Sequence, residues 1–262
     1  VAIEYLPFLG TSKLKPAEVQ QEFYKIGCSF NVFNSNDQVW VSLTGLSENF
    51  KKGVELFENL LADAQPNPEA LQNLSSDILK KRADLKLSKQ EILWSAMYSF
   101  GVYGKKSPLT NILSEKELKE LKPEELVKQI HELTSFEHRV LYYGSEDADK
   151  VHDELKKLHK TPDALKPLPT ETDFPELATE KTNVYVVNYD MQQAEIVMLS
   201  KSENYNKNII PQASLFNEYF GGGMSSVVFQ DMRESKALAY SVFASFRSPA
   251  KKEKAHYVMA YI

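Results

Sequence analysis

The sequence predicts an α+β fold made of two copies of one unit, each an antiparallel sheet with helices packed on one face, the second copy truncated. Residues 16–46 read as a helix, a strand, a turn and a strand, and residues 225–262 repeat this order with a turn of similar length. Residues 161–182 lie between them and hold four prolines without apolar periodicity, which indicates an extended linker. We therefore expect one domain over residues 1–160, a linker over 161–182 and a second, C-terminally truncated domain over 183–262.

Composition excludes several classes of protein. At 262 residues the chain is long enough for one large domain or two ordinary ones. A hydrophobic fraction of 42% and a charged fraction of 26% are typical of a soluble globular protein. The formal net charge of -5 argues against a nucleic-acid surface, and no run approaches the roughly 18 apolar residues of a membrane span. Cys28 is the single cysteine, so the sequence offers neither an intrachain disulfide nor a cysteine metal cluster.

Both ends of the sequence indicate an internal piece of a longer protein. The chain opens at Val1 without an initiator Met and without a basic targeting segment, and it ends in HYVMAYI, within an expected strand. We therefore expect further sequence on either side of these residues.

Proline and glycine mark the first elements. Pro7 and Gly10 restrict any helix in the opening stretch to a short one. Pro16 stands at the first position of a helix that we expect to run to about Ile26, and Gly27 closes it.

A β-hairpin follows, and then a series of helices. Residues 28–33 and 39–46 alternate between apolar and polar, and the turn formers of residues 34–37 lie between them. Apolar residues at helical spacing, with prolines and capping-box patterns at their starts, predict helices at 50–61, 69–86, 88–100, 123–133 and 147–159.

The rest of the chain alternates strands with two helices. The helices are expected at residues 209–220 and 225–236, on either side of Gly221–Gly222–Gly223. Strands are expected at 136–143, 183–189, 194–200, 238–247 and 255–262.

The histidines do not match a helical zinc motif. The H-E-x-x-H type of site needs two imidazoles four residues apart on one helix face, and no two histidines here have that spacing. His152 and His159 are seven apart on a lysine-rich helix, for which a solvated face is the favoured interpretation over a metal site. For His138, at the start of an expected strand, we favour hydrogen bonding over a ligand role.

Two further features have structural interpretations. Gly221–Gly222–Gly223 lacks the Lys-Ser/Thr partner of a phosphate-binding loop, so we interpret it as a tight turn that needs positive φ angles. Cys28 alternates with Phe30 and Val32, which favours a buried strand thiol over a nucleophile.

Arg233 and Tyr240 are the one pair of polar residues with a possible binding role. A helix that returns into a strand can bring residues seven apart onto one side of a sheet edge. A guanidinium and a phenol together can hold a peptide carbonyl or stabilise an oxyanion. The alternative is that Tyr240 is a core tyrosine on the strand face of Leu238 and Val242, with Arg233 in a surface ion pair.

The run NEYFGGGMSSVVFQDMRESKALAYSVFASF decides between these interpretations, because it closely resembles a segment of the M16 metallopeptidases, the pitrilysin-type inverzincins. In that family the segment reads G-G-G-M-S-S, F-Q-x-x-R-E and then A-Y-S. The match covers about thirty residues. The resemblance implies that Arg233 and Tyr240 face a catalytic chamber and contact the substrate.

The first eleven residues resemble the family's zinc-binding segment without its ligands. Phe8-Leu9-Gly10-Thr11 is similar to the F-x-G-T that follows the inverted motif H-x-x-E-H, which places that motif over residues 1–5. Glu4 then matches the catalytic glutamate as a vestige, while Val1 and Tyr5 replace the two histidine ligands. For the third ligand, a Glu some seventy to eighty residues on in the family, both Glu69 and Asp77 remain candidates.

The departure from the motif predicts that this chain holds no zinc and no catalytic residue of its own. An aliphatic side chain and a phenol do not substitute for two neutral imidazoles. Without Zn²⁺ there is no Lewis acid and no water with a lowered pKa. The resemblance implies that zinc sits in an active half elsewhere in the parent protein or in a partner subunit.

Family architecture gives these features a role. M16 enzymes often hold four homologous α+β domains in two halves that close around an unfolded peptide, and one half is degenerate. We interpret this chain as that catalytically inactive half, forming the chamber wall and binding extended peptide for the zinc-bearing half. The compartment stays open between bacterial periplasm and cytoplasm.

Two other functions compete with this interpretation. The chain could be part of a non-catalytic scaffold or peptide-binding subunit of an M16-like complex, although a pure scaffold has no need of the Arg233–Tyr240 pair. An unrelated enzyme that uses Cys28 or the histidines is the remaining hypothesis.

Overall fold

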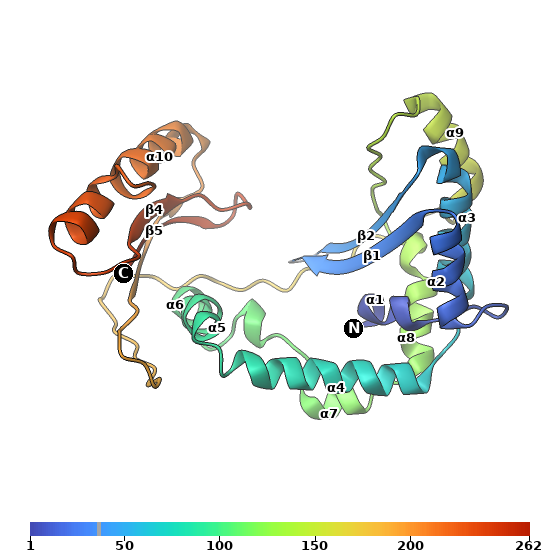
Figure 1. The fold of residues 1–262 in the computed structure, drawn as a ribbon, viewed down its shortest axis with the longest axis horizontal. Coiled ribbons are helices and arrows are strands. Elements are labelled where there is room, and N and C mark those ends of the chain that lie inside the picture. The colour runs from blue at the N-terminus through green and yellow to red at the C-terminus, as the bar shows by residue number, and fades with distance from the viewer. Residues whose placement is uncertain (36–37) are drawn as a thin grey trace. The chain divides into compact units, whose positions relative to one another are not determined.

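The computed structural model describes residues 1–35 and 38–262 (Figure 1). The chain forms two compact units. Unit 1 contains residues 1–81 and 113–172, and unit 2 contains residues 82–112 and 173–262. Within the described ranges, no helix is both long and apolar enough to cross a membrane.

Unit 1 combines one β-hairpin with several helices, and the hairpin and the longer helices follow the predicted order. Prolines open three of the helices, where the missing N–H costs no hydrogen bond. Its main elements are α1 (Ala2–Tyr5), α2 (Pro16–Lys25), β1 (Cys28–Ser35), β2 (Gln38–Gly45), α3 (Phe50–Asp63), α4 (Pro68–Leu85, which continues into unit 2), α7 (Glu115–Lys119), α8 (Pro123–His131) and α9 (Ala148–Leu158).

The predicted hairpin is confirmed. β1 and β2 pair antiparallel from Cys28 opposite Gly45 to Ser35 opposite Gln38. Gly27 precedes β1 with φ +61, the left-handed conformation that ends α2 after Lys25 and that favours glycine. The predicted turn at residues 34–37 falls partly on residues 36–37, which lie outside the described part of the chain.

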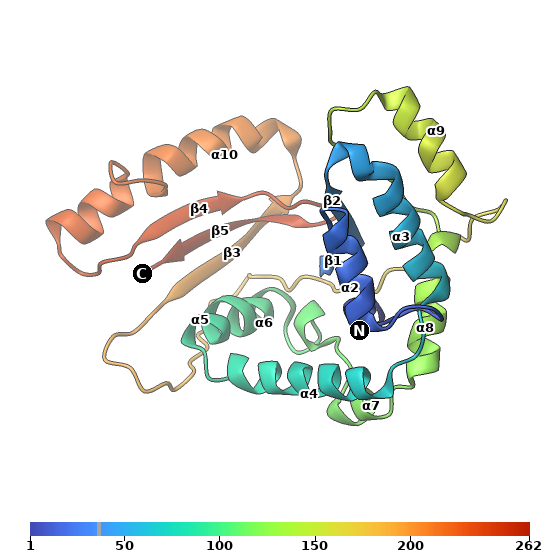
Figure 2. The same ribbon diagram turned by 45° about the vertical axis from the view of Figure 1, so that its right-hand side comes forward.

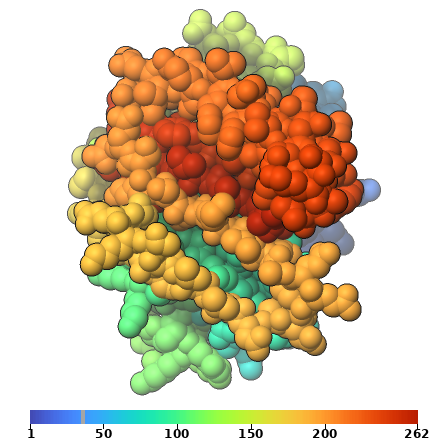
Figure 3. All heavy atoms as spheres, turned by 90° about the vertical axis from the view of Figure 1, so that its left-hand side faces the viewer, coloured from blue at the N-terminus to red at the C-terminus, as the bar shows by residue number. Residues whose placement is uncertain are grey.

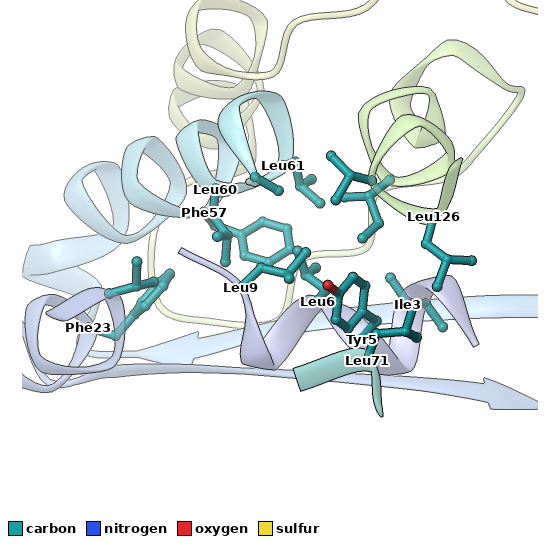
Figure 4. Close-up of a cluster of buried hydrophobic side chains, with 14 of the residues drawn as sticks. Ile3, Tyr5, Leu6, Leu9, Phe23, Phe57, Leu60, Leu61, Leu71 and Leu126 are labelled. Atoms are coloured by element: carbon teal, nitrogen blue, oxygen red, sulfur yellow. The ribbon is translucent and has the colours of Figure 1, made fainter. Parts of the chain in front are cut away.

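The core of unit 1 gathers side chains from the hairpin and the surrounding helices (Figure 4). Phe30 on β1 lies between two helical rings, with centroid distances of 5.0 Å to Phe23 and 5.4 Å to Phe57. The short α1 and the 3₁₀ turn after it add Ile3, Tyr5, Leu6 and Leu9. The opening stretch therefore contributes four buried side chains to this core.

Unit 2 contains a three-stranded antiparallel sheet of order β3–β5–β4 and helices that are partly π-helical. Figure 2 shows the three strands side by side. The elements are α5 (Lys89–Glu91), a π-helical stretch (Ile92–Met97), α6 (Tyr98–Tyr103), β3 (Val197–Asn204), α10 (Ile210–Phe216), two further π-helical stretches (Asn217–Gly221 and Phe229–Ser235), β4 (Phe243–Arg247) and β5 (Ala255–Tyr261).

Helical segments contact one face of this sheet and its β4 edge. On one face Trp94 lies against Phe243 and Tyr261, with ring centroids 5.9 and 5.0 Å away. At the edge strand β4, the Asn217 side chain accepts from the Phe246 N–H at 2.6 Å and donates to its carbonyl at 3.0 Å. In the space-filling view the dark red atoms of the last residues remain visible between the orange segments of unit 2 (Figure 3).

The α+β class with antiparallel sheets and helices is confirmed, and the helix–strand–strand order recurs in α2–β1–β2 and in the π-helical stretch Phe229–Ser235 with β4–β5. Two predicted strands are wrong. Residues 136–143 form only an isolated bridge from Phe136 to Lys166, and residues 183–189 form no strand. β-branched and aromatic residues mark a segment that fits a sheet, but a strand also needs a neighbour with free backbone groups.

The prediction of positive φ angles in the glycine turn is also wrong. Among the described glycines, positive φ values occur at Gly27 and Gly104 only. Gly221 is required for another reason: a Cβ there would overlap the backbone of Ala244 on β4. Glycine at this position lets the end of the helix approach the strand closely.

Candidate functional site

Tyr5, at the position of the second zinc ligand in the resemblance, is built into the core of unit 1. Its side chain is fully buried (Figure 4). The hydroxyl donates to the Asn67 carbonyl at 2.6 Å and accepts from the Asn67 N–H at 2.8 Å. Burial raises the pKa of this phenol. Tyr5 therefore joins α1 to the residues that begin α4.

The other positions of the motif do not converge on a common point. Val1 is half-buried and packs against the core, whereas Glu4 is exposed. Glu69 and Asp77 both line a pocket of about 400 Å³ beside Phe8 on the surface of unit 1. In the described part of the chain, no group of three or more His, Cys, Asp or Glu side chains is placed to hold a metal ion.

Arg233 and Tyr240 are brought together in unit 2. The guanidinium carbon lies 4.2 Å from the centroid of the Tyr240 ring, within the range of a cation–π contact. Tyr240 is 80% exposed, so the interpretation as a core tyrosine is wrong. The other part of that alternative, a surface ion pair, is present: the Arg233 Nε lies 3.4 Å from Glu234 Oε1.

The chain reversal after the helix places Tyr240 over Arg233. The π-helical stretch ends at Ser235, and Ala237 follows with φ +50, the one positive φ of a non-glycine residue in the described ranges. The Leu238 N–H then donates to the Met232 carbonyl at 2.9 Å. The predicted strand at 238–247 starts only at Phe243, so Tyr240 lies in a loop rather than in the sheet.

Phe229 is a member of this site that sequence reasoning missed. The Arg233 guanidinium carbon lies 4.6 Å from the Phe229 ring centroid as well. The signal was the spacing of four residues, which brings two side chains onto one helix face. A guanidinium carries five N–H donors, of which Nε lies beside Glu234 here, so the two terminal NH₂ groups can serve a ligand.

Cys28 takes no part in a site. Its thiol is buried beside Gly45 and Gly53, and burial raises its pKa. A thiol in this state is a poor nucleophile. The interpretation of Cys28 as a buried strand residue is confirmed.

Two family models match the chain. The one described as "Peptidase M16 inactive domain" matches residues 121–262, and the one described as "Insulinase (Peptidase family M16)" matches residues 3–111. An "Uncharacterized zinc protease" of Rickettsia felis is 25% identical over 244 residues, covering 92% of this chain and 58% of the relative. The "Uncharacterized zinc protease YmxG" of Bacillus subtilis is 24% identical over 243 residues, covering 92% and 58%. The chain thus spans somewhat less than two thirds of the length of these relatives.

Solved structures share the fold. A protease from Helicobacter pylori gives a TM-score of 0.68 at 19% identity, covering 99% of this chain and 63% of that one. A peptidase M16 inactive domain from Pseudomonas fluorescens gives a TM-score of 0.69 at 15% identity, and the match covers 99% of this chain and 62% of that one. The ferredoxin protease FusC, in complex with Arabidopsis ferredoxin, gives 0.73 at 16% identity, covering 99% and 28%. With both family models matching and together covering most of its length, the chain belongs to peptidase family M16.

Proposed function

We propose that this chain is a catalytically inactive, peptidase-like region of an M16 zinc metalloendopeptidase. It forms part of the chamber wall and binds extended peptide, which it positions for a zinc-bearing half in the parent protein or in a partner subunit. The observation that carries the proposal is the buried Tyr5, whose hydroxyl is committed to the Asn67 backbone at 2.6 and 2.8 Å. A phenol held in this way replaces an imidazole ligand with a structural contact.

The exposed pair of unit 2 supports the binding role. The Arg233 guanidinium offers planar N–H donors, and the Tyr240 hydroxyl can donate or accept. The aromatic rings of Phe229 and Tyr240 hold the guanidinium in place, at 4.6 and 4.2 Å. A preorganised donor pair of this kind suits the carbonyl groups of an extended peptide, since less side-chain entropy is lost on binding.

The names of the relatives support the proposal that the parent protein is a zinc protease. Their names describe zinc proteases, so zinc belongs to the expected parent protein. FusC, a ferredoxin protease of this fold, was solved with a protein partner bound. For the present chain we propose polypeptide as the ligand class and assign the metal to the other half.

The binding role is tested by fluorescence anisotropy with a labelled, unstructured peptide. We expect Arg233→Lys to weaken binding about tenfold, because an ammonium lacks the planar donor set. We expect Tyr240→Phe to weaken it roughly threefold to tenfold, since the ring stays and only the hydroxyl is lost. Tyr219→Phe, at a tyrosine that is 70% exposed in the same unit, is the matched control and should bind like the wild type.

Unchanged binding in both site variants would exclude the substrate role of the pair and favour a scaffold subunit. The inactive role has a separate test. Elemental analysis and a peptide-cleavage assay of the chain should show neither stoichiometric zinc nor metal-dependent hydrolysis. A tightly bound zinc with cleavage that a chelator abolishes would contradict it.

A further inference from the structure

Three titratable side chains of unit 1 form a continuous hydrogen-bonded line that the M16 site does not include. Glu58 on α3 accepts from His159 Nδ1 at 2.7 Å. His159 lies at the C-terminal end of α9, and its Nε2 is 2.8 Å from Nε2 of His138. His138 Nδ1 in turn is 2.6 Å from the carbonyl oxygen of Phe136. The line joins α3, α9 and the segment at residues 136–138.

The acceptors at the two ends fix the number of protons in the line. A carbonyl oxygen only accepts, so His138 Nδ1 carries a proton. An ionised Glu58 likewise requires a proton on His159 Nδ1. In two neutral imidazoles both Nε2 atoms would then carry lone pairs, and these would face each other at 2.8 Å. The observed distance is that of a hydrogen bond only if one additional proton lies between the two nitrogens.

We infer that Glu58, His159 and His138 form a site for one proton, which fastens residues 136–138 to α3 and α9 while it is bound. With the proton in place Glu58 is a carboxylate, His159 an imidazolium and His138 a neutral imidazole, so the net charge of the three side chains is zero. Moving the proton from His159 Nδ1 onto Glu58 leaves the same number of protons in the line. No metal is required at this position. The two Nε2 atoms are 2.8 Å apart, which is too close for an ion that binds each nitrogen at about 2 Å, and the centroid distance of 4.9 Å shows that they face each other nearly head-on.

The surroundings favour a proton at this position. Side-chain exposure is 19% for His159 and 17% for Glu58, so solvent screens their pairing only in part. On α3, Glu55 pairs with Lys51, and on α9, Glu154 pairs with Lys157. Glu137 and Arg139 flank His138, and Lys160 follows His159. Among the residues that the structure describes, Glu58 is the one carboxylate within ion-pair distance of either of these two rings.

The sign of the pH dependence follows from the direction of the shift. The hydrogen bond to Glu58 raises the pKa of His159, in spite of partial burial. For the His159–Glu58 pair, a raised folded-state pKa means that the stabilisation is fully present below the ordinary histidine pKa of about 6.5 and is lost as the pH rises through the folded-state value. The contact between the two Nε2 atoms requires one proton and not two, so it is also lost if a second proton binds in more acidic solution. Above that value, residues 136–138 lose this attachment to both helices.

The test is a double-mutant cycle of His138→Gln and His159→Gln in the 262-residue chain, followed by urea denaturation at about pH 6 and about pH 8.5. We expect the two histidines to be coupled at the lower pH by about threefold to tenfold in the folding equilibrium constant. At the higher pH the coupling should vanish. His152→Gln, at a histidine that is 65% exposed on the same helix, is the control and should keep the wild-type pH dependence.

A measurement on the unmodified chain keeps the inference testable if a variant fails to fold. In ¹H–¹⁵N spectra of the imidazole rings, a coupling across the hydrogen bond between the Nε2 atoms of His138 and His159 should be present at about pH 6 and absent at about pH 8.5, and EDTA should leave the spectra unchanged. The absence of this coupling at both pH values, or a double-mutant coupling energy that is equal at both, would overturn the inference. A change on adding EDTA would also overturn it, since a metal would then hold the two rings together. None of these outcomes depends on peptide binding by unit 2.

Discussion

At the scale of single residues, the position that the proposed register equates with a zinc ligand has a structural role in this chain. Tyr5 is fully buried and its hydroxyl serves two backbone groups of Asn67. A histidine in this position would offer a ring nitrogen to a metal, whereas the phenol extends further and reaches the start of α4. Tyrosine at this position therefore supplies hydrogen bonds within the core, where a histidine could supply a metal ligand.

Tyr5→Phe should destabilise unit 1 by about 1–3 kcal/mol. In this variant the Asn67 carbonyl still accepts a hydrogen bond from the Leu71 N–H at 3.1 Å, but the Asn67 N–H loses the Tyr5 hydroxyl as its acceptor. Urea denaturation monitored by circular dichroism measures the effect. Tyr24→Phe, at a tyrosine that is 85% exposed, is the control and should be neutral. Equal stability of the two variants would show that the buried hydroxyl contributes nothing.

At the scale of elements, the glycine at position 221 is explained by the close approach of a helix end to β4 and not by a positive φ angle. The π-helical stretch Asn217–Gly221 packs on β4, and Asn217 holds both backbone groups of Phe246. Gly221 completes this contact because it presents only a hydrogen atom toward Ala244. The glycine turn thus joins a helix end to the strand that follows Tyr240.

Gly221→Ala should cost about 1–3 kcal/mol or more, because the added methyl group would force the helix end away from β4. Gly223→Ala is the matched control, since a Cβ there meets nothing within 4 Å. It should change the free energy of unfolding by less than about 0.5 kcal/mol. Thermal unfolding of the two variants measures the difference. A neutral Gly221→Ala variant would contradict the close approach.

At the scale of the whole molecule, the chain crosses between its two compact units more than once. Residues 82–112 belong to unit 2, although unit 1 contains the sequence on either side of them. They are held there by the stacking of Trp94 on Phe243 and by the packing of Val102 against Tyr257. The domain division proposed from the sequence, with a linker at residues 161–182, stays a prediction.

Hydrogen exchange tests how this segment unfolds. We expect the amides of residues 92–103 to lose protection together with those of β5, because their apolar contacts lie on that sheet. Exchange at increasing urea concentrations, followed by mass spectrometry of peptides, would measure this. If residues 92–103 instead open together with α3 and β1, the sequence-predicted domain of residues 1–160 behaves as one cooperative body.

Prediction from the sequence succeeded where the signal was local. The hairpin of residues 28–46 and the helix opened by Pro16 follow from alternation, turn formers and proline at the first helical position. It failed for residues 136–143 and 183–189, which are rich in β-branched and aromatic residues. Strand formation there depends on a neighbouring edge, and one sequence segment carries no information on its partner.

For the candidate site, the sequence determined the residue types and the family: the absence of histidine at Val1 and Tyr5, and the presence of Arg233 and Tyr240 in a specific run. These follow directly from the order of residues. Only the tertiary structure decided that Tyr5 is buried against Asn67 and that an exposed Tyr240 lies over Arg233. The physical reason is that burial and side-chain contact arise from segments far apart in the chain or from a reversal of its direction, as at Ala237.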